Sequence, residues 1–179
     1  MQIDLTGRTA LISGGSKGLG LAAAVRLAES GADVAMLARR PDVLDEARQA
    51  VQARAPQRKV VTVACDLSCA EGVTEGYARA RAALGPIDIL LNNVGGHALG
   101  RFDEVSDAQW EHDLQIKLMA TVRLTRLCWP EMVARRWGRV INTLNTLAKA
   151  PIAGSCPTAV TRAAQLALTK VLEIGRAHV

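Results

Sequence analysis

The chain has 179 residues, of which 49% are hydrophobic and 22% are charged. This composition is typical of a single globular domain and excludes a disordered segment. The net charge of +5 comes from basic residues spread along the chain with few aromatic residues, so we expect no nucleic-acid partner. The N-terminus lacks a signal peptide pattern, and no apolar run approaches the ~20 residues that span a bilayer. We therefore expect a cytoplasmic protein without membrane contact.

The cysteines and histidines indicate neither disulfides nor a metal site. The cysteines at 65, 69, 128 and 156 lack CxxC spacing and lie within or beside apolar stretches. We expect buried, reduced thiols, as in a cytoplasmic protein. The three histidines are far apart in the sequence, so we expect no metal.

Short apolar runs alternate with helical patterns along the first half of the chain. The runs are typical of buried strands, and the longer segments repeat apolar residues at helical spacing. The expected strands, each with the helix that follows it, are 9–13 with 18–30, 34–38 with 41–55, and 59–64 with 70–84.

The second half continues the same alternation. A fourth strand is expected at 87–91, after which Ser106 caps a long helix to about 133 that Pro130 bends or ends. A fifth strand at 139–144 precedes a final helix that begins near Pro157. Five β-α units in succession predict an α/β fold with a doubly wound parallel sheet, the Rossmann fold.

A glycine-rich turn joins the first expected strand to the first expected helix. Gly14 permits a tight turn, Gly18 lets the backbone approach a pyrophosphate, and Gly20 lets the helix pack closely on the sheet. The helix N-terminus then offers free N–H groups to phosphates. The turn predicts a dinucleotide site, with a purely structural turn as the alternative. Its expected binding residues are Gly14, Ser16, Lys17, Gly18, Leu19 and Gly20.

Three segments together resemble the short-chain dehydrogenase/reductase family. They are the GxxxGxG turn, Cys65-Asp66-Leu67-Ser68 after the third strand and Asn92-Asn93-Val94-Gly95 after the fourth. The resemblance covers nearly the whole chain and implies a nucleotide-binding Rossmann domain over residues 1–172. It implies that Asp66, with Leu67 beside it, binds the adenine. It also implies that Asn93 and Gly95 lie beside the nicotinamide ribose.

The end of the second strand predicts which nucleotide binds. An NAD-binding protein of this kind has an acidic residue there for the ribose hydroxyls, whereas this chain has Ala38 followed by Arg39 and Arg40. Arginine pairs well with a phosphate, and Lys17 adds a second cation from the glycine turn. We expect NADP rather than NAD, and the alternative is that the two arginines are only a solvated pair.

The residues that the resemblance associates with proton transfer are replaced in this chain. The family uses a tyrosine, a lysine four residues later, a serine thirteen residues before the tyrosine, and an asparagine on the long helix. The corresponding positions hold Thr158, Arg162, Asn145 and Lys117. The only tyrosine, Tyr77, lies in the third expected helix and away from these positions.

The replacements differ in what chemistry they can retain. Asn145 can still polarise a carbonyl, and Arg162 can still bond a ribose but cannot lose its proton near neutral pH. The Thr158 hydroxyl is a far weaker acid than a phenol with a pKa of ~10. Lys117 can donate a proton if burial lowers its pKa, with a surface lysine as the alternative. His97 follows the fourth strand, where it either lines the pocket or is solvated.

Two functions remain open from the sequence. The first is an NADP-dependent oxidoreductase with a non-standard catalytic set, which transfers hydride between nicotinamide and a small carbonyl or alcohol substrate. The second is a non-catalytic NADP(H)-binding protein, such as a partner subunit or sensor. The resemblance also implies that the full-length protein forms a homo-oligomer.

The end of the chain departs from the helical pattern. The resemblance implies two further strands and a substrate lid, so we expect a truncated reading frame that lacks them. Gly175 interrupts the last apolar face, and residues 173–179 match what a common sequencing-library adapter encodes in one frame. We therefore expect residues 173–179 to be a non-native tail.

Overall fold

The computed structural model describes residues 3–96 and 98–175 and contains a five-stranded sheet. All neighbouring strands are parallel, in the order β3-β2-β1-β4-β6. The predicted α/β Rossmann fold is therefore confirmed. The strands are β1 (Thr9–Ser13), β2 (Asp33–Ala38), β3 (Val60–Ala64), β4 (Ile89–Asn92) and β6 (Arg139–Asn142).

The strand order reverses between β1 and β4. The chain runs outward from β1 to β3 and then returns to pair β4 with the other side of β1. Loops after β1 and β4 separate at this point and leave a crevice at the carboxyl ends of the strands, where ligands bind in open α/β sheets.

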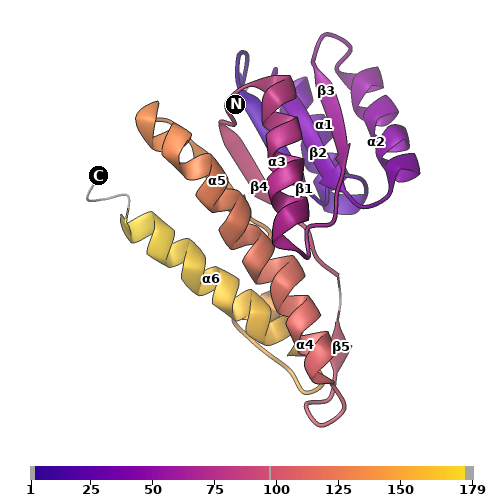
Figure 1. Cartoon of the computed structure of the whole chain (residues 1–179), viewed down its shortest axis with the longest axis vertical. Coiled ribbons are helices and arrows are strands. Elements are labelled where there is room, and N and C mark those ends of the chain that lie inside the picture. Colours follow the sequence, from indigo (N-terminus) through magenta and orange to yellow (C-terminus); the bar gives the residue numbers. More distant parts are fainter. Residues whose placement is uncertain (1–2, 97, 176–179) are drawn as a thin grey trace.

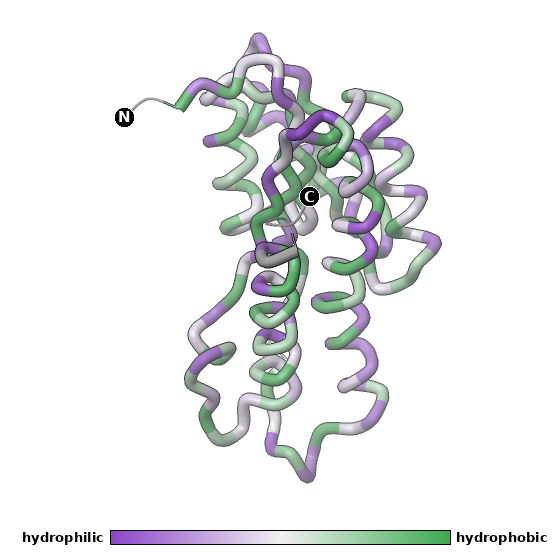
Figure 2. Tube along the Cα trace, turned by 90° about the vertical axis from the view of Figure 1, so that its left-hand side faces the viewer, coloured by the Kyte–Doolittle hydropathy of each residue, from purple (hydrophilic) through white to green (hydrophobic). Residues whose placement is uncertain are grey.

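Helices cover both faces of the sheet (Figure 1). Hydrophobic and hydrophilic segments alternate along these helices, as expected for helices with one buried face (Figure 2). The helices are α1 (Gly18–Glu29), α2 (Pro41–Arg54), α3 (Ala70–Leu84), α4 (Asp107–Asp113), α5 (Ala120–Ala134) and α6 (Thr158–Gly175).

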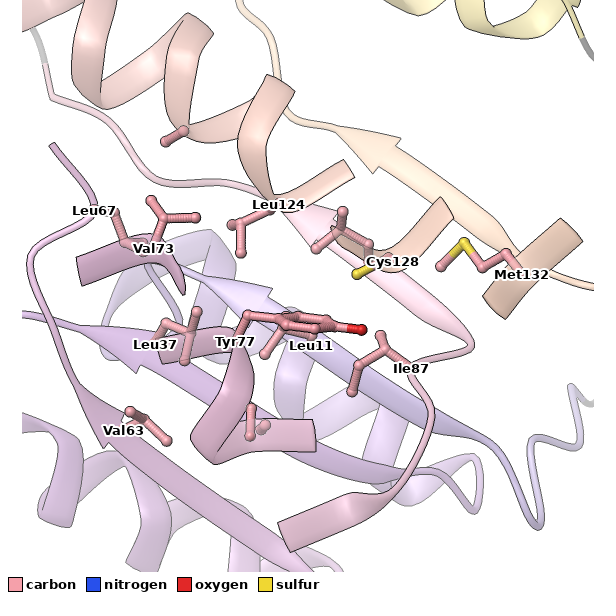
Figure 3. Close-up of a cluster of buried hydrophobic side chains, with 14 residues drawn as sticks. Leu11, Leu37, Val63, Leu67, Val73, Tyr77, Ile87, Leu124, Cys128 and Met132 are labelled. Atoms are coloured by element: carbon pink, nitrogen blue, oxygen red, sulfur yellow. The ribbon is translucent and has the colours of Figure 1, made fainter. Parts of the chain in front are cut away.

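Two apolar cores result from the alternation of side chains along the strands. On one face, Ile12 and Met36 pack with residues of α1 and α2. On the other face, Leu11 and Leu37 pack with residues of α3 and α5. Tyr77 lies in this second core between α3 and the sheet (Figure 3), and burial raises its pKa to about 12. The only tyrosine therefore has a structural position, as the sequence predicted.

The long helix predicted after Ser106 is not uniform. Ser106 forms a capping box with Gln109, which confirms the predicted start. The helix then changes to a π-helical segment, η1 (Leu114–Met119), between α4 and α5. Pro130 lies inside α5, which continues to Ala134, so the expectation that Pro130 could end the helix is wrong.

Two short strands were not predicted. β5 (Leu99–Gly100) pairs antiparallel with β7 (Cys156–Pro157), and a short 3-10 helix, η2 (Thr146–Ala148), follows β6. Segments this short leave no periodic pattern in a sequence. The pair brings the loop after β4 against the start of α6.

The C-terminal helix extends further than predicted. Its backbone stays helical through Gly175, so the expected interruption at 173–175 is wrong. Residues 176–179 lie outside the described part, and a non-native tail at 173–179 stays a prediction.

The cysteines are reduced, but they differ in burial. All four cysteines are free, and Cys128 is buried as expected. Cys65 and Cys156 are partly buried, whereas Cys69 is exposed, so the expectation of a buried thiol is wrong there. The Cys69 Sγ accepts a hydrogen bond from the Gly72 N–H and caps α3. Within the described residues, no helix combines the length and the apolarity that a membrane crossing requires.

Candidate functional site

A cavity of about 790 Å³ opens at the carboxyl ends of the strands. It lies at the reversal of strand order and is lined by loops that follow β1, β2, β3 and β4, together with residues of α4 and η1. Seven of the predicted cofactor-binding residues line it. They are Gly14, Ser16, Lys17, Arg39, Leu67, Asn93 and Gly95.

The glycine turn is held tightly against the sheet. Gly14 has a positive φ of 67° and donates its N–H to the Leu37 carbonyl of β2 at 2.8 Å. A Cβ at Gly20 would lie 2.2 Å from the Gly14 carbonyl oxygen, so only glycine fits there. Gly18 also has a positive φ, of 54°. Gly14 and Gly18 thus have backbone conformations that favour glycine, and Gly20 permits a close approach within the turn, while the contact of Gly18 with a pyrophosphate stays a prediction.

The N-terminus of α1 begins beside this cavity. Lys17 occupies the N-cap position and makes no side-chain capping bond. The first N–H groups of the helix are therefore not capped by that side chain, which leaves them available to an anion. Leu19 is exposed on the first turn.

Hydrogen bonds between the end of β1 and the loop after β4 hold the turn in place. The Ser13 hydroxyl accepts hydrogen bonds from the N–H groups of Asn93 at 3.0 Å and Val94 at 3.2 Å. The Asn93 amide donates to the Gly14 carbonyl at 3.0 Å. Asn93 therefore supports the loop geometry in addition to lining the cavity.

Asp66 stands at the third strand-to-helix turn. Its carboxylate accepts bonds from the Ser68 N–H at 2.9 Å and the Ser68 hydroxyl at 2.8 Å. These bonds, with a smaller effect from Arg39, lower the pKa of Asp66. The carboxylate therefore stays ionised at neutral pH and can accept a further hydrogen bond, while Leu67 is buried behind it.

Three exposed cations lie along one side of the cavity. Arg39 and Arg40 follow β2, and Lys17 belongs to the glycine turn. Ala38 at the end of β2 adds no negative charge. This part of the cavity is suited to a phosphate group.

Two of the four predicted catalytic residues are in direct contact behind the cavity wall. Lys117 is fully buried, and its Nζ donates to the Thr158 hydroxyl at 2.7 Å and to the Asp113 carboxylate. The Thr158 hydroxyl donates in turn to the Ala98 carbonyl at 2.7 Å. Ala98 and Asp113 line the cavity, so Lys117 and Thr158 lie one hydrogen bond behind its surface.

Arg162 approaches the same place from α6. Its guanidinium donates to the Thr143 carbonyl at 3.0 Å and to the Gln165 side chain at 2.6 Å. A Cβ at Gly95 would lie 2.6 Å from Arg162 Nη2 and 3.3 Å from Lys117 Cγ. Gly95 has a φ of 154°, which favours glycine, and a side chain there would press on the Arg162 guanidinium and contact Lys117 tightly.

Burial shifts the pKa values of both cations. Desolvation lowers the pKa of Lys117, while Asp113 opposes the shift and Arg162 adds to it. Desolvation also lowers the pKa of Arg162. Lys117 therefore loses its proton more readily than an exposed lysine, which a proton donor requires.

Asn145 is not joined to this cluster by a hydrogen bond. It precedes η2, and its Oδ1 is buried without a hydrogen-bond partner among the described residues. His97 lies outside the described residues. No group of three or more potential ligands for a metal ion occurs in the described part of the chain.

Two residues of the cluster were missed from the sequence. Asp113 pairs with Lys117, four residues later, a spacing that places both on one side of a helix. Gln165 is buried and donates to the Lys117 carbonyl and the Thr121 hydroxyl. The Asp–Lys spacing is a signal that could have found Asp113, whereas only the packing of α6 reveals Gln165.

A model of the family described as short chain dehydrogenase matches residues 8–176. The chain belongs to the short-chain dehydrogenase family. An uncharacterized oxidoreductase of Bacillus subtilis, YvaG, is 30% identical over 172 residues, which are 96% of this chain and 64% of that protein. The chain thus spans less than two thirds of the length of this curated relative.

Solved structures of the family superpose closely. L-Sorbose reductase from Gluconobacter frateurii, solved with NADPH and L-sorbose, has a TM-score of 0.92 and 34% identity, covering 96% of this chain and 65% of that one. A short chain oxidoreductase from Pseudomonas aeruginosa, solved with NADPH and described as containing an atypical catalytic center, has a TM-score of 0.91 and 30% identity. That match covers 98% of this chain and 68% of that one.

The close approach at Gly20 generates a first prediction. Gly20→Ala forces a Cβ against the Gly14 carbonyl and the Asn93 amide, so we expect a loss of stability of about 1–3 kcal/mol. The displaced turn also lowers NADPH affinity at least about tenfold, which is about 1.4 kcal/mol. Thermal melting and calorimetric titration with NADPH measure both effects.

Gly96→Ala is the matched control. Gly96 lines the same cavity, and a Cβ there meets no atom within 4 Å. It should leave melting unchanged, because the added methyl group displaces no protein atom. Unchanged melting and unchanged NADPH affinity in Gly20→Ala would contradict the role of the turn.

Proposed function

We propose that this chain is the nucleotide-binding part, over residues 1–172, of an NADP-dependent oxidoreductase that interconverts a carbonyl and an alcohol on a small molecule. The observation that carries the proposal is the buried Lys117 ammonium bonded to the Thr158 hydroxyl directly behind the cavity wall. The pair supplies an ionisable proton donor at the positions where the resemblance places the family's asparagine and tyrosine.

The cavity fits NADP in its shape and charge. The turn from Gly14 to Gly20 leaves backbone space at the uncapped start of α1, where a pyrophosphate is bound. Arg39 and Lys17 would hold the 2′-phosphate, while Asp66 and Leu67 would hold the adenine. Gly18 and Leu19 complete the turn, with Ser16 at the cavity wall.

Asn93 and Gly95 would lie beside the nicotinamide ribose. This end of the cavity adjoins Lys117 and Arg162, both of which approach Gly95. Bound NADPH supplies the hydride, and bound NADP⁺ accepts it in the reverse direction. The two NADPH-containing relatives support this choice over NAD.

The proton comes from the chain itself. Lys117 holds it on Nζ, bonded to the Thr158 hydroxyl. The substrate oxygen replaces the Ala98 carbonyl as the acceptor of the Thr158 hydroxyl hydrogen, and Thr158 recovers a proton from Lys117. Threonine alone is too weak an acid for this step, so the adjacent ammonium is essential.

Arg162 and Asn145 act without changing protonation. The Arg162 guanidinium places a fixed positive charge beside Gly95, which stabilises negative charge that develops on a substrate oxygen. The Asn145 side-chain amide lies in the loop between β6 and η2. It can donate a hydrogen bond to a carbonyl oxygen and so polarise it. The relatives compared above are oxidoreductases, and none supports the non-catalytic alternative.

We further propose a cytoplasmic homo-oligomer. Four free cysteines fit a reducing compartment. Val133 of α5 and Val160 and Val171 of α6 are exposed, which favours a protein contact on these helices. Light scattering of the purified protein measures the oligomeric state.

A second prediction concerns the choice of nucleotide. Arg39→Ala removes a charged donor to the 2′-phosphate, so we expect NADPH affinity to fall by about 1.5–3 kcal/mol, roughly 10- to 150-fold. NADH affinity should remain unchanged. Arg48→Ala, an exposed arginine on α2 that does not line the cavity, is the control. Equal losses of NADPH and NADH affinity in Arg39→Ala would contradict 2′-phosphate binding.

A third prediction concerns the proton donor. The protonated form of Lys117 is active in reduction, so the rate should fall as the pH rises through the pKa of Lys117. Burial places that fall below the ordinary range of lysine. Lys117→Met should lower the rate of carbonyl reduction by about 10²–10⁴-fold and remove this dependence on pH. Stopped-flow decay of NADPH fluorescence measures the rate.

Lys170→Met is the control for this variant because Lys170 is exposed and pairs with the exposed Glu173 on the same helix. Unchanged NADPH affinity in Lys117→Met would show that the nucleotide site remains intact. A rate equal to that of the unaltered chain at every pH would rule out Lys117 as the donor.

A further inference from the structure

Asp113 is a buried carboxylate that lines the cavity and has an unusual set of partners. One of its oxygens, Oδ1, pairs with the Lys117 ammonium. The other, Oδ2, is buried without a hydrogen-bond partner among the described residues. An unsatisfied carboxylate oxygen is costly in a protein interior and indicates a role beyond packing.

The backbone changes its hydrogen-bonding pattern directly after Asp113. The π-helical segment η1 begins at Leu114 and contains Lys117. Such segments are rare and are frequent at functional sites. The Lys117 carbonyl accepts bonds from Thr121 at 2.8 Å and from Gln165 of α6 at 3.0 Å, which fix the backbone from which its side chain extends.

One negative and one positive group act on the Lys117 ammonium in opposite directions. Among the described residues, the charged groups that shift its pKa are Asp113 of α4 and Arg162 of α6. Burial and Arg162 favour loss of the proton, and Asp113 alone favours its retention. His112 lines the cavity next to Asp113 in sequence. Without the Asp113 charge, no negative charge among the described residues that shift this pKa offsets the cost of a buried ammonium beside a guanidinium, and only the hydrogen bond to Thr158 remains.

We propose that Asp113 is a positioning residue that keeps the buried Lys117 ammonium charged and directed at the Thr158 hydroxyl. Asp113, Lys117 and Thr158 then form one proton-delivery unit, a role that rests on the oxidoreductase function proposed above. The unit spans α4, η1 and α6 and meets the cavity at Asp113.

The delivery step is balanced within these residues. The Thr158 O–H bond breaks as its hydrogen passes to the substrate oxygen, whose carbon receives the hydride from NADPH. A proton from Lys117 Nζ re-forms the hydroxyl, so Lys117 becomes neutral while Asp113 stays a carboxylate. Water then returns a proton to Lys117, and alcohol oxidation runs through the same steps in reverse.

The test measures the protonation of Lys117 without substrate or nucleotide. Lysine side chains are labelled with ¹³C and ¹⁵N in the full chain and followed by NMR over a pH series, and Lys117→Met identifies the signal. We expect Asp113→Asn to lower the pKa of Lys117 by about 1 to 3. Asp113→Glu retains the negative charge, so the pKa of Lys117 in this variant should stay close to its value in the unaltered chain.

Glu111→Gln is the matched control because Glu111 is an exposed acid on the same helix. It should leave the pKa of Lys117 unchanged. If Asp113→Asn also leaves it unchanged while circular dichroism shows a folded protein, the proposal is overturned. If Asp113→Asn does not fold, the test uses the unaltered chain and Asp113→Glu. A neutral Lys117 at pH 7 in the unaltered chain overturns the proposal. A charged Lys117 in both proteins supports it.

The pH dependence of carbonyl reduction separates this proposal from the proposed function. In Asp113→Asn, the fall in rate at rising pH should move to lower pH by the same amount as the NMR titration. If Asp113→Asn shifts the NMR titration of Lys117 but leaves the pH profile of the rate unshifted, Asp113 controls Lys117 but proton delivery through Lys117 is overturned. An unshifted titration overturns the role of Asp113, whatever the rate.

Discussion

The candidate site depends on the burial of the Lys117 ammonium, which extends from η1 to contact Asp113 of α4 and Thr158 of α6. A fully buried ammonium is unfavourable unless it is paired and hydrogen-bonded. Lys117 pairs with Asp113, four residues earlier, and donates a hydrogen bond to Thr158 at the start of α6. These bonds connect the long helix to α6 behind the loop after β4. Gly95 lies against both cations, and a Cβ there would come within 2.6 Å of Arg162 Nη2 and 3.3 Å of Lys117 Cγ.

The proposed nucleotide end and the proposed reacting end of the cavity depend on different kinds of constraint. The nucleotide end is built from backbone: glycines with positive φ, a close approach between Gly14 and Gly20, and an uncapped helix start. The reacting end is built from buried charge, with two cations and one carboxylate in a small volume. The backbone end carries the glycine turn on which the family resemblance rests, and the charged end holds Lys117 and Arg162, two of the replacements expected from that resemblance.

The strands, most helices and the nucleotide turn could be predicted because each depends on local sequence. Apolar runs such as 34–38 predict buried strands, and glycine spacing predicts the turn. The π-helical segment could not be predicted, since Lys117 and its carbonyl are held by Thr158 and Gln165 from a distant helix. The functional importance of Asp113 was missed for the same reason. Its i,i+4 spacing to Lys117 is ordinary on a helix surface, and only burial makes the pair unusual.

Replacement of the Thr158 hydroxyl tests the central claim most directly. Thr158→Val keeps the shape of the side chain but removes the hydroxyl that joins Lys117 to the Ala98 carbonyl at the cavity wall. Single-turnover reduction of a carbonyl substrate by NADPH should slow by about 10²–10⁴-fold, with NADPH affinity unchanged. A single-turnover rate equal to that of the unaltered chain would contradict proton delivery through Lys117 and Thr158.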